Sequence, residues 1–515
     1  MNRTLTATLA LLLASLGLPL AVAQDYKEQV RDYPPDLSET FRPALPEDFY
    51  PGGEPALGPL PGAISIFDVV VSNTNKNLKN TNTTANSEPS IAINPANTNE
   101  IVILAFSGGW GATAPLWYSS NGGSLWTLEN TIPNPPGLSE NCPCDQNPDY
   151  GTSGRMSATF LHNDNSGIDA YSNTTWDPTT ESAWQWFVTG GVTQTTDQQG
   201  IGNSDQPWLL VNKDPKNTTR SNVYVAYDNF DGAPDMRVAV APGNPPDFTT
   251  DKLVGYSGGA INPGQRLAKD LNSLAIYSLW EVCPISVSNC NSLSANPKTI
   301  DYYLNRSTDG GKTWSLNGSS TGLFLVETQS TQPQPKFGTV NALLGGVDHL
   351  AVDPNNGDVY VVYGNRDSTT GINRLSIGRL TSNGLGGLKW VNSFFVVGQA
   401  ETALPSVAIA KNKNGTIGVL YTNFDGIDST TKLPQFSAFL AISNDHGKSF
   451  TYNRLEKFLS TTKDNGNNRQ RVLGDYQQLK AVGNTFYGVF AGNGVPFGRP
   501  FANIDPIFFK TTVSD

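Results

Sequence analysis

The sequence predicts an all-β fold, a seven-bladed β-propeller, with a six-bladed ring as the alternative. A short two-strand unit recurs seven times along the chain, at a spacing of several tens of residues. A turn sequence of the type Ser-x-Asp-x-Gly-x-Thr-Trp recurs three times. A spare β-branched segment, residues 64–71, precedes the first unit. Repeated short strands separated by turn signals are typical of radial β arrays with four strands in each blade.

The chain begins with two segments that are not part of this array. Residues 1–23 combine Arg3, an apolar run and the small-residue end Ala21-Val22-Ala23, which is the pattern of a signal peptide. We therefore expect a secreted protein, extracellular or periplasmic. Residues 24–62 are acidic and rich in proline, which excludes a helix or a central strand and predicts an extended N-terminal arm.

Residues 63–515 are then expected to form the propeller domain. In the clear repeats two apolar strands follow each other closely, at residues 89–94 and 101–106, 207–212 and 223–227, 349–354 and 359–363, and 405–410 and 417–421. Weaker copies begin near Arg155, Arg266 and Tyr476. The last copy offers only three strands, so residues 64–71 are predicted to supply its fourth strand. This pairing would close the ring and cover the edge that an open array exposes.

The three copies of the turn sequence lie at residues 119–126, 307–314 and 443–450. In such a turn the Ser and Asp side chains can accept hydrogen bonds from backbone N–H groups, glycine supplies a positive φ, and the aromatic residue packs underneath. The turns are predicted between the third and fourth strands of their blades, on the face opposite the candidate site. The pattern resembles the Asp box, or BNR repeat, of the sialidase-like β-propellers. This resemblance covers residues 64–513 and implies a fold that glycosidases, polysaccharide lyases and non-enzymatic receptors share.

Composition limits the partners. The formal charge is −11 and the pI is about 4.9, which argues against nucleic acid and anionic membranes as partners. No apolar run after the signal reaches the ~18 residues of a transmembrane segment. We expect a carbohydrate substrate and, by default, a monomer.

The four cysteines suggest local bridges in loops, and a metal site would need more ligands than the Cys142/Cys144 pair and three histidines supply. Cys283 and Cys290 could pair, whereas Cys142 and Cys144 are harder to interpret. No organic cofactor is expected. A bound cation stays open because carboxylates converge, although the sequence has no calcium loop of the Asp-x-Asp-x-Asp-Gly type.

The candidate site follows from strand direction. Strands alternate within a blade, so the first strand starts at the face where the second strand ends. Ionisable and polar groups are predicted to gather there at the mouth of the central channel. The candidate catalytic residues are Asp205, Tyr476 and Glu281, and the candidate substrate-binding residues are Arg155, Arg266, Asp348, His349, Asp475, Gln477 and Trp110.

The residue types suit a sugar substrate, since arginine grips a carboxylate, paired acids transfer protons and an aromatic ring can hold a sugar ring. Other interpretations stay open: a repeated Asp can cap a turn, and His349 can be an interior histidine. The resemblance to sialidases implies more specific roles. Arg155 and Arg266 would bind a substrate carboxylate, Tyr476 assisted by Glu281 would be the nucleophile, and Asp205 would be the acid/base.

Three functions fit this sequence. The first is a secreted, sialidase-like glycoside hydrolase that acts on a terminal or acidic sugar through carboxylates. The second is a polysaccharide lyase on the same scaffold, in which Tyr476 or His349 removes a proton beside a uronic acid carboxylate. The third is a glycan- or protein-binding propeller without catalysis.

Overall fold

A computed structural model gives the architecture of the chain. It describes residues 64–69, 87–106, 110–138, 144–163, 168–187, 203–230, 235–242, 248, 250–255, 260–283, 298–330, 349–366, 369, 371, 373–396, 401–463, 472–497, 501 and 504–514. The segments predicted as signal peptide and N-terminal arm lie outside these ranges. Only two short 3-10 helices, η2 (Glu181–Ala183) and η4 (Val495–Phe497), interrupt the strands of the described residues. None of the described residues forms a helix long and apolar enough to cross a membrane.

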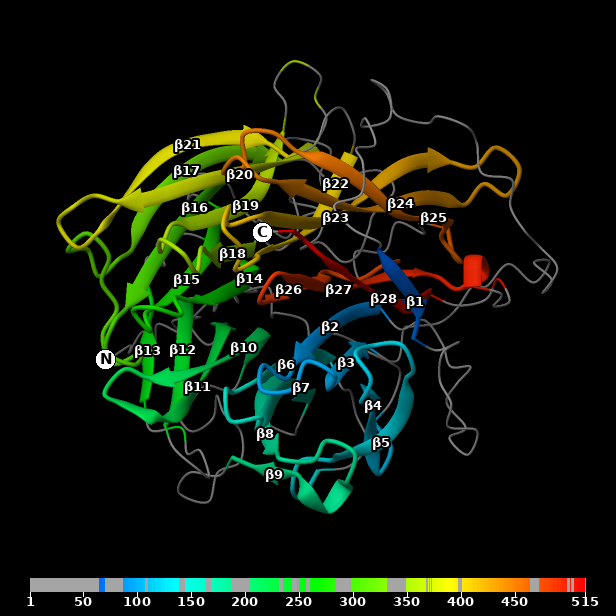
Figure 1. The fold of residues 1–515 in the computed structure, drawn as a ribbon, viewed down its shortest axis with the longest axis horizontal. Helices are drawn as coiled ribbons and strands as arrows, with labels where there is room; N and C mark the ends of the chain where they lie inside the picture. The colour runs from blue at the N-terminus through cyan, green and yellow to red at the C-terminus, as the bar shows by residue number, and fades with distance from the viewer. Residues whose placement is uncertain are drawn as a thin grey trace, which may run out of the picture.

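The described strands form seven antiparallel sheets of four strands each, as the sequence predicts. The sheets stand around a common axis (Figure 1). The first, innermost strands are β2 (Ser87–Ile93), β6 (Cys144–Tyr150), β10 (Ser204–Asp214), β14 (Ala260–Lys269), β18 (His349–Val352), β22 (Glu401–Ile409) and β26 (Gln478–Val482). The second strands are β3 (Ile101–Phe106), β7 (Met156–Asn163), β11 (Asn217–Asn229), β15 (Ile276–Cys283), β19 (Val359–Arg366), β23 (Ile417–Ile427) and β27 (Thr485–Asn493).

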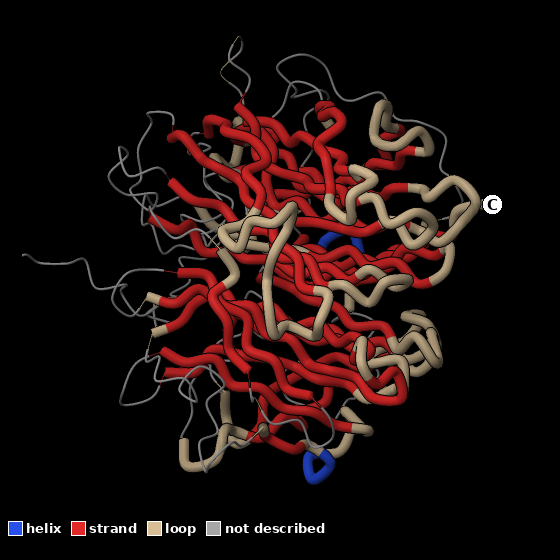
Figure 2. Tube along the Cα trace, turned by 90° about the vertical axis from the view of Figure 1, so that its left-hand side faces the viewer, coloured by secondary structure: helices blue, strands red, loops and turns tan. Residues whose placement is uncertain are grey.

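The outer half of each blade is also antiparallel. The third strands are β4 (Thr113–Ser119), β8 (Ile168–Thr175), β12 (Asp235–Pro242), β16 (Lys298–Ser307), β20 (Asn373–Ser382), β24 (Pro434–Ser443) and β28 (Ile504–Thr512). The fourth strands are β5 (Thr127–Pro133), β9 (Gln185–Trp186), β13 (Thr250–Leu253), β17 (Leu323–Ser330), β21 (Leu388–Phe395), β25 (Thr451–Leu459) and β1 (Ser65–Asp68). Seen from the side, the strands run across the thickness of the ring (Figure 2).

The seventh blade joins the two ends of the propeller domain. Strand β1 pairs with β28, with Ser65 opposite Lys510 and Asp68 opposite Ile507. The two strands lie side by side in Figure 1, β1 in blue and β28 in red. The predicted closure by the N-terminal strand is therefore confirmed. Each innermost strand also contacts the innermost strand of the next blade, so the seven blades form a closed ring.

The prediction that Arg155 starts an innermost strand is wrong. The innermost strand of blade 2 is β6, and Arg155 lies in the turn that leads into β7. Strand β6 has the sequence Cys-Asp-Gln-Asn-Pro-Asp-Tyr and is buried along its whole length. Its polar side chains bond neighbouring blades: Asn147 accepts from the N–H of Leu209 at 3.0 Å, and Asp149 accepts from the N–H of Val211 at 2.9 Å. A strand that is stabilised in this way lacks the apolar pattern by which strands are found.

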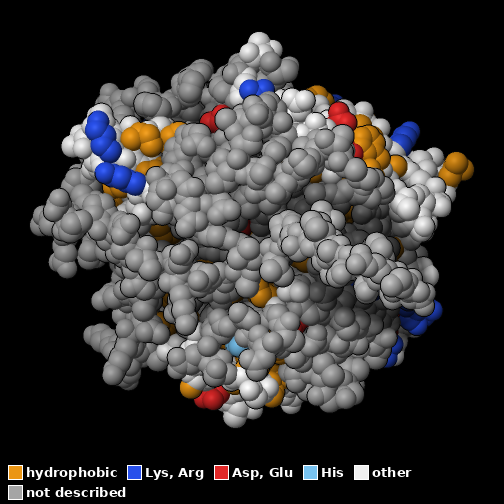
Figure 3. All heavy atoms as spheres, turned by 180° about the vertical axis from the view of Figure 1, so that it is seen from behind, with side chains coloured by type: hydrophobic (Ala, Val, Ile, Leu, Met, Phe, Trp, Pro, Cys, Tyr) orange, Lys and Arg blue, Asp and Glu red, His pale blue; other side chains and the backbone are white. Residues whose placement is uncertain are grey.

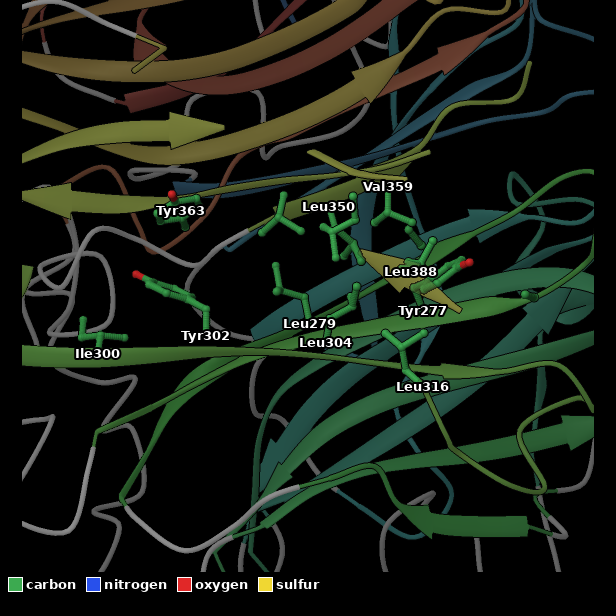
Figure 4. Close-up of a cluster of buried hydrophobic side chains, with 14 of the residues drawn as sticks. Tyr277, Leu279, Ile300, Tyr302, Leu304, Leu316, Leu350, Val359, Tyr363 and Leu388 are labelled. Atoms are coloured by element: carbon green, nitrogen blue, oxygen red, sulfur yellow. The ribbon is translucent and has the colours of Figure 1, made fainter. Parts of the chain in front are cut away.

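Hydrophobic clusters lie between adjacent blades. One of them joins blades 4 and 5, and its side chains point toward one another from both sheets (Figure 4). There the rings of Tyr302 and Tyr363 lie 5.2 Å apart, and the Tyr302 hydroxyl donates to the carbonyl of Gly364 at 3.3 Å. Because each pair of blades has a core of this kind, the domain does not depend on one large core.

The three repeated turns lie between third and fourth strands, as predicted, at β4–β5, β16–β17 and β24–β25. In the second of them, Ser307 Oγ accepts from the N–H of Gly311 at 2.8 Å. Asp309 Oδ1 accepts from the N–H groups of Lys312 at 3.1 Å and Thr313 at 3.0 Å. Gly311 has a φ of 83°, and an added Cβ would lie 2.4 Å from Val240. The turn thus needs glycine, and its carboxylate organises the backbone.

Replacing Asp309 tests this function of the turn. Asp309→Ala leaves two N–H groups without their acceptor and should lower the free energy of unfolding by about 1–2 kcal/mol. Asp309→Asn keeps an acceptor oxygen, and Asn121 occupies the same position in the first turn with hydrogen bonds to Ser124 and Leu125. Urea unfolding of both variants measures the difference. Equal losses for Ala and Asn would contradict the capping role.

Candidate functional site

Six of the innermost segments share a kink near their starts. In five strands the pairing with the second strand shifts there, as between Ser87 and Ser90 in β2. The residues at the kink have positive φ: Glu88 at 52°, Asp145 at 45°, Gln206 at 47° and Leu404 at 60°, with glycines Gly264 and Gly474 at the equivalent places. Such a bulge redirects side chains, and a positive φ at residues other than glycine is a strained backbone state that is concentrated at functional sites.

Two residues beyond the kink, large side chains meet on the axis of the ring. The guanidinium carbon of Arg266 lies 4.0 Å from the ring centroid of Trp208 and 5.6 Å from that of Tyr476. The rings of Trp208 and Tyr476 are 5.9 Å apart and perpendicular. Arg266 Nη2 donates to Gln206 Oε1 at 3.2 Å, and Nη1 donates to the carbonyl of Gln265 at 3.0 Å. Blades 3, 4 and 7 therefore fix this cation in place.

His349 belongs to the same layer. Its ring lies 5.7 Å from the Trp208 ring, edge to face. Its Nδ1 accepts from the N–H of Val407 at 3.3 Å, which assigns the proton of the neutral ring to Nε2. Burial, followed by the charges of Arg266 and Lys480, lowers the pKa of His349 to about 3. The imidazole is thus neutral at any pH near 7.

Carboxyl groups surround the Arg266 guanidinium. Burial raises the pKa of Asp145 well above its usual range. The neighbouring carboxyl groups of Asp205 and Asp475 raise it further, and Arg266 opposes the shift. Burial also raises the pKa of Asp228 strongly, with added contributions from Asp205 and Glu281. The N–H of Gly264, which donates to Asp228 Oδ2 at 3.0 Å, and Arg266 act in the other direction.

Asp475 has a further link to this group, because its N–H donates to Glu88 Oε1 at 3.1 Å. We call Asp145, Asp205, Asp228, Glu281 and Asp475, with Arg266, the carboxyl cluster. In it, burial and mutual repulsion favour the protonated forms of Asp145 and Asp228 beside a fixed positive charge.

The structure brings most of the predicted site residues together. Asp205, Glu281, Asp475 and Arg266 interact electrostatically in the carboxyl cluster, and Tyr476 and His349 contact Trp208 next to it. The Tyr476 hydroxyl donates to the carbonyl of Gln146 at 3.4 Å.

Gln477 has a structural position beside the site. Its Nε2 donates to the carbonyl of Leu404 at 2.8 Å, and its Oε1 accepts from Thr422 at 3.2 Å. Both ends of the amide thus join blade 7 to blade 6. Asp348 lies outside the described residues.

Two predicted residues lie elsewhere. Arg155 follows the end of β6, at the opposite end of the strand from the kink, and contacts Trp176 and Gln185. Trp110 is fully buried, and its Nε1 donates to the carbonyl of Ile132 at 3.0 Å. It packs between blades 1 and 2 instead of presenting a face to a sugar, because the apolar gap between those blades can bury the indole.

Sequence reasoning missed Asp145, which follows Cys144 in a stretch that resembles a polar loop. The signal was an alignment across blades: Asp145-Gln146-Asn147 occupies the same bulge as Gln206-Pro207-Trp208. The two cysteines in the described residues, Cys144 and Cys283, are both disulfide-bonded. Cys142 and Cys290 lie outside the described ranges.

A second polar group lies farther along the innermost strands. Asp149 of blade 2 bonds Lys480 Nζ of blade 7 at 2.9 Å and Lys269 Nζ of blade 4 at 3.3 Å. Burial alone would raise the pKa of Asp149, but the two ammonium groups and the Val211 N–H more than offset it and lower the pKa. This bridge joins one carboxylate to lysines of two blades that are not its neighbours, which indicates a structural role.

Other cations lie away from the axis. Seen from behind, the visible Lys and Arg side chains of the described residues lie toward the edge of the molecule (Figure 3), whereas Arg266 is 1% exposed. Among the described residues, no group of three or more His, Cys, Asp or Glu side chains is arranged to hold a metal ion.

Comparisons with known proteins give fold-level likenesses. No protein-family model and no curated protein matches the chain. Similar solved structures include the polysaccharide lyase Uly1, with 10% identity, a TM-score of 0.49 and coverage of 89% of this chain and 99% of that one. The Hadza microbial sialidase Hz136 is 10% identical, with a TM-score of 0.30 and coverage of 68% and 74%. The Penicillium chrysogenum alpha-L-arabinanase is 13% identical, with a TM-score of 0.32 and coverage of 60% and 98%. With these scores, no activity is transferred from them to this chain.

Replacing Asp228 tests the electrostatics of the cluster. A carboxyl whose pKa is raised on folding stabilises the protein below its unfolded pKa, near 4, and this contribution is lost as the pH rises through the folded pKa. Asp228→Asn has no carboxyl to ionise, so it should not show this pH-dependent loss of stability. In urea titrations, its free energy of unfolding relative to that of the wild type should therefore rise between pH 4.5 and pH 8.

Asp214→Asn is the matched control. Burial is outweighed there by the Lys216 N–H and Arg220, which lower the pKa of Asp214. This carboxyl is ionised in both the folded and the unfolded state above pH 4.5, so Asp214→Asn should be less stable than the wild type by a nearly constant amount over the same pH interval. A flat difference between wild type and Asp228→Asn would contradict a raised pKa for Asp228.

Proposed function

We propose that this protein is an exported, carbohydrate-active enzyme of sialidase-like build, a glycoside hydrolase that acts on a terminal or acidic sugar. One observation carries the proposal: the buried Asp145 interacts electrostatically with Asp205 inside a carboxyl cluster that contains the Arg266 cation. Two carboxyl groups whose environments separate their pKa values are the usual basis of acid/base assignments in hydrolases. Export is supported by the signal-like N-terminus and by the disulfides at Cys144 and Cys283, since disulfides persist in oxidising compartments.

The chemical roles follow from the pKa directions. The raised pKa of Asp145 favours its protonated form, which can donate a proton to the glycosidic oxygen as the C–O bond breaks. Arg266 lowers the pKa of Asp145 and so stabilises the carboxylate that remains after the transfer. The sugar ring gains positive charge in this step, and the acidic cluster suits a cationic transition state.

Asp145→Asn and Asp205→Asn are the direct tests. Each should lower kcat by roughly 10²–10⁴-fold, the usual contribution of general acid–base catalysis, with little change in melting temperature. The substrates are sialosides, neutral aryl glycosides and uronic acid oligosaccharides, with products identified by mass spectrometry. Asp301→Asn is the matched control, because Asp301 is a half-buried carboxyl in β16, opposite Glu327 on β17, with a pKa that burial raises. Full activity of both cluster variants would remove this pair from the mechanism.

Tyr476→Phe tests the role of the Tyr476 hydroxyl separately from that of its aromatic ring. The variant keeps the ring contacts with Trp208 and Arg266 and loses the hydrogen bond to Gln146, so folding should be preserved. If Tyr476 is the nucleophile that the sialidase resemblance implies, turnover is abolished while the melting temperature is unchanged. If turnover persists, the reaction uses carboxyl groups alone.

A second candidate, a polysaccharide lyase, is favoured by one observation. His349 is neutral near pH 7 and lies with Tyr476 against Trp208, next to Arg266. Tyr476 can remove the proton beside a uronic acid carboxylate while a cation neutralises that carboxylate. The Nε2–H of neutral His349 can donate to the substrate, because its Nδ1 already accepts from the N–H of Val407. Lyase activity leaves an ultraviolet-absorbing double bond in the product, whereas hydrolysis incorporates water. Saccharide binding with neither product would favour a non-catalytic propeller.

A further inference from the structure

Blade 2 has a different connection where three other blades have the closed turn. Between β8 and β9, residues 176–184 form a connection that contains η2 and presents Trp176 to solvent. The connection lies at the lower edge of the ring in Figure 1. Trp176 is 59% exposed, whereas Trp126 and Trp314 in the closed turns are 0% and 5% exposed. The connection follows a third strand, so it lies on the face of the repeated turns, away from the carboxyl cluster.

The exposed indole is held by an ordered turn. The Asp177 N–H donates to Thr175 Oγ1 at 3.0 Å, and Asp177 Oδ1 accepts from the N–H of Thr179 at 3.0 Å. Thr131 of blade 1 donates to the carbonyl of Pro178 at 2.7 Å. The backbone on the C-terminal side of Trp176 is thus fixed to two blades. An aromatic side chain on a pre-organised backbone loses less entropy when a ligand binds.

Polar groups border the indole. The guanidinium carbon of Arg155 lies 5.7 Å from the ring centroid of Trp176, and its Nη2 donates to Gln185 Oε1 at 3.4 Å. Burial lowers the pKa of Arg155, and among the described residues no carboxylate forms a salt bridge with it. Guanidinium hydrogens therefore remain for the hydroxyl groups of a ligand.

The local charge selects against an anionic ligand. Asp177 lies near Glu129, whose pKa is raised by burial and by Asp177. It also contributes, after burial and Glu100, to the raised pKa of Tyr118, about 12. Acidic groups therefore outnumber Arg155 around the connection. A protein partner would need a contiguous apolar patch, but no other exposed large hydrophobic side chain of the described residues belongs to blade 2.

We propose that Trp176, with Arg155 and Gln185 at its border, is a second carbohydrate-binding site that takes a neutral pyranose ring of a polysaccharide. The C–H face of the sugar would stack on the free face of the indole, and its hydroxyls would accept from Arg155 and exchange hydrogen bonds with Gln185. The choice of ligand class rests on the proposed function, but the site lies on the opposite face from the proposed chemistry. It would hold a polymer to the enzyme without contributing to bond cleavage.

Affinity electrophoresis in gels that contain laminarin, galactomannan or polygalacturonate tests this site, with intrinsic fluorescence as a second readout. We expect a neutral polysaccharide to retard the wild-type protein. Trp176→Ala should weaken this binding about tenfold, and Trp176→Phe should weaken it less. Leu385→Ala is the control, because Leu385 is 90% exposed on blade 5. Circular dichroism melting of Trp176→Ala checks the fold.

The outcomes separate this site from the proposed activity. Asp145→Asn should bind the neutral polysaccharide like the wild type, through Trp176, whether or not it cleaves a substrate. The proposal is overturned if Trp176→Ala is retarded as strongly as the wild type, if no neutral polysaccharide retards the wild type, or if polygalacturonate binds more tightly in a Trp176-dependent way.

Discussion

The charge of Arg266 is the constraint on which the centre of this propeller depends. The guanidinium is buried between Trp208 and Tyr476 and is held by Gln206 and the carbonyl of Gln265. Burying an unpaired charge is costly, so this cation and the surrounding carboxyl groups need one another. The carboxyl groups of the cluster outnumber the Arg266 cation. Their mutual repulsion therefore favours the protonated forms of Asp145 and Asp228. Seven small cores between the blades supply the stability that permits such a strained polar centre.

Backbone geometry and chemistry are coupled at the kinks of the innermost strands. Gly264 and Gly474 adopt positive φ without strain, but Glu88, Asp145 and Gln206 hold the same conformation with side chains. Asp145 belongs to the carboxyl cluster, Glu88 accepts from the backbone of Asp475, and Gln206 accepts from Arg266. Three of the four strained non-glycine positions at the kinks thus carry side chains that build the site, and the fourth, Leu404, packs in a hydrophobic cluster. Glycine at Glu88, Asp145 or Gln206 would relieve the backbone strain but would remove the side chain that the site uses.

The sequence predicted the ring well and its centre only in part. Repeated apolar strands and turns identify blades because burial between sheets imposes the same pattern in each copy, and the missing strand of blade 7 pointed to residues 64–71. Strand β6 escaped because its buried side chains are polar and bond other blades, so Asp145 was missed and Arg155 was misplaced. Trp110 was misplaced for a different reason. The glycines beside it suggested an accessible ring, but the sequence does not reveal that a neighbouring blade covers the indole. Contacts between blades determine both the course of strand β6 and the burial of Trp110, and the local spacing of residues does not encode such contacts.

The carboxyl groups of this chain divide according to what surrounds them, and the division favours a chemical role for the cluster. Backbone N–H groups at Asp309 and Asp445, and two lysines at Asp149, outweigh burial and lower the pKa of these carboxyls, which makes them permanent anions of the framework. Glu456 is at the other extreme: burial, Asp68 and Asp505 raise its pKa, and only the Asn493 N–H opposes the shift, so its protonated form is favoured. Asp145 and Asp228 differ from both kinds, because burial and neighbouring carboxyls raise their pKa while Arg266 pulls it down. A protonated carboxyl beside a fixed cation can give up its proton and leave a stabilised carboxylate, which neither a permanent anion nor a buried acid without a neighbouring cation can do.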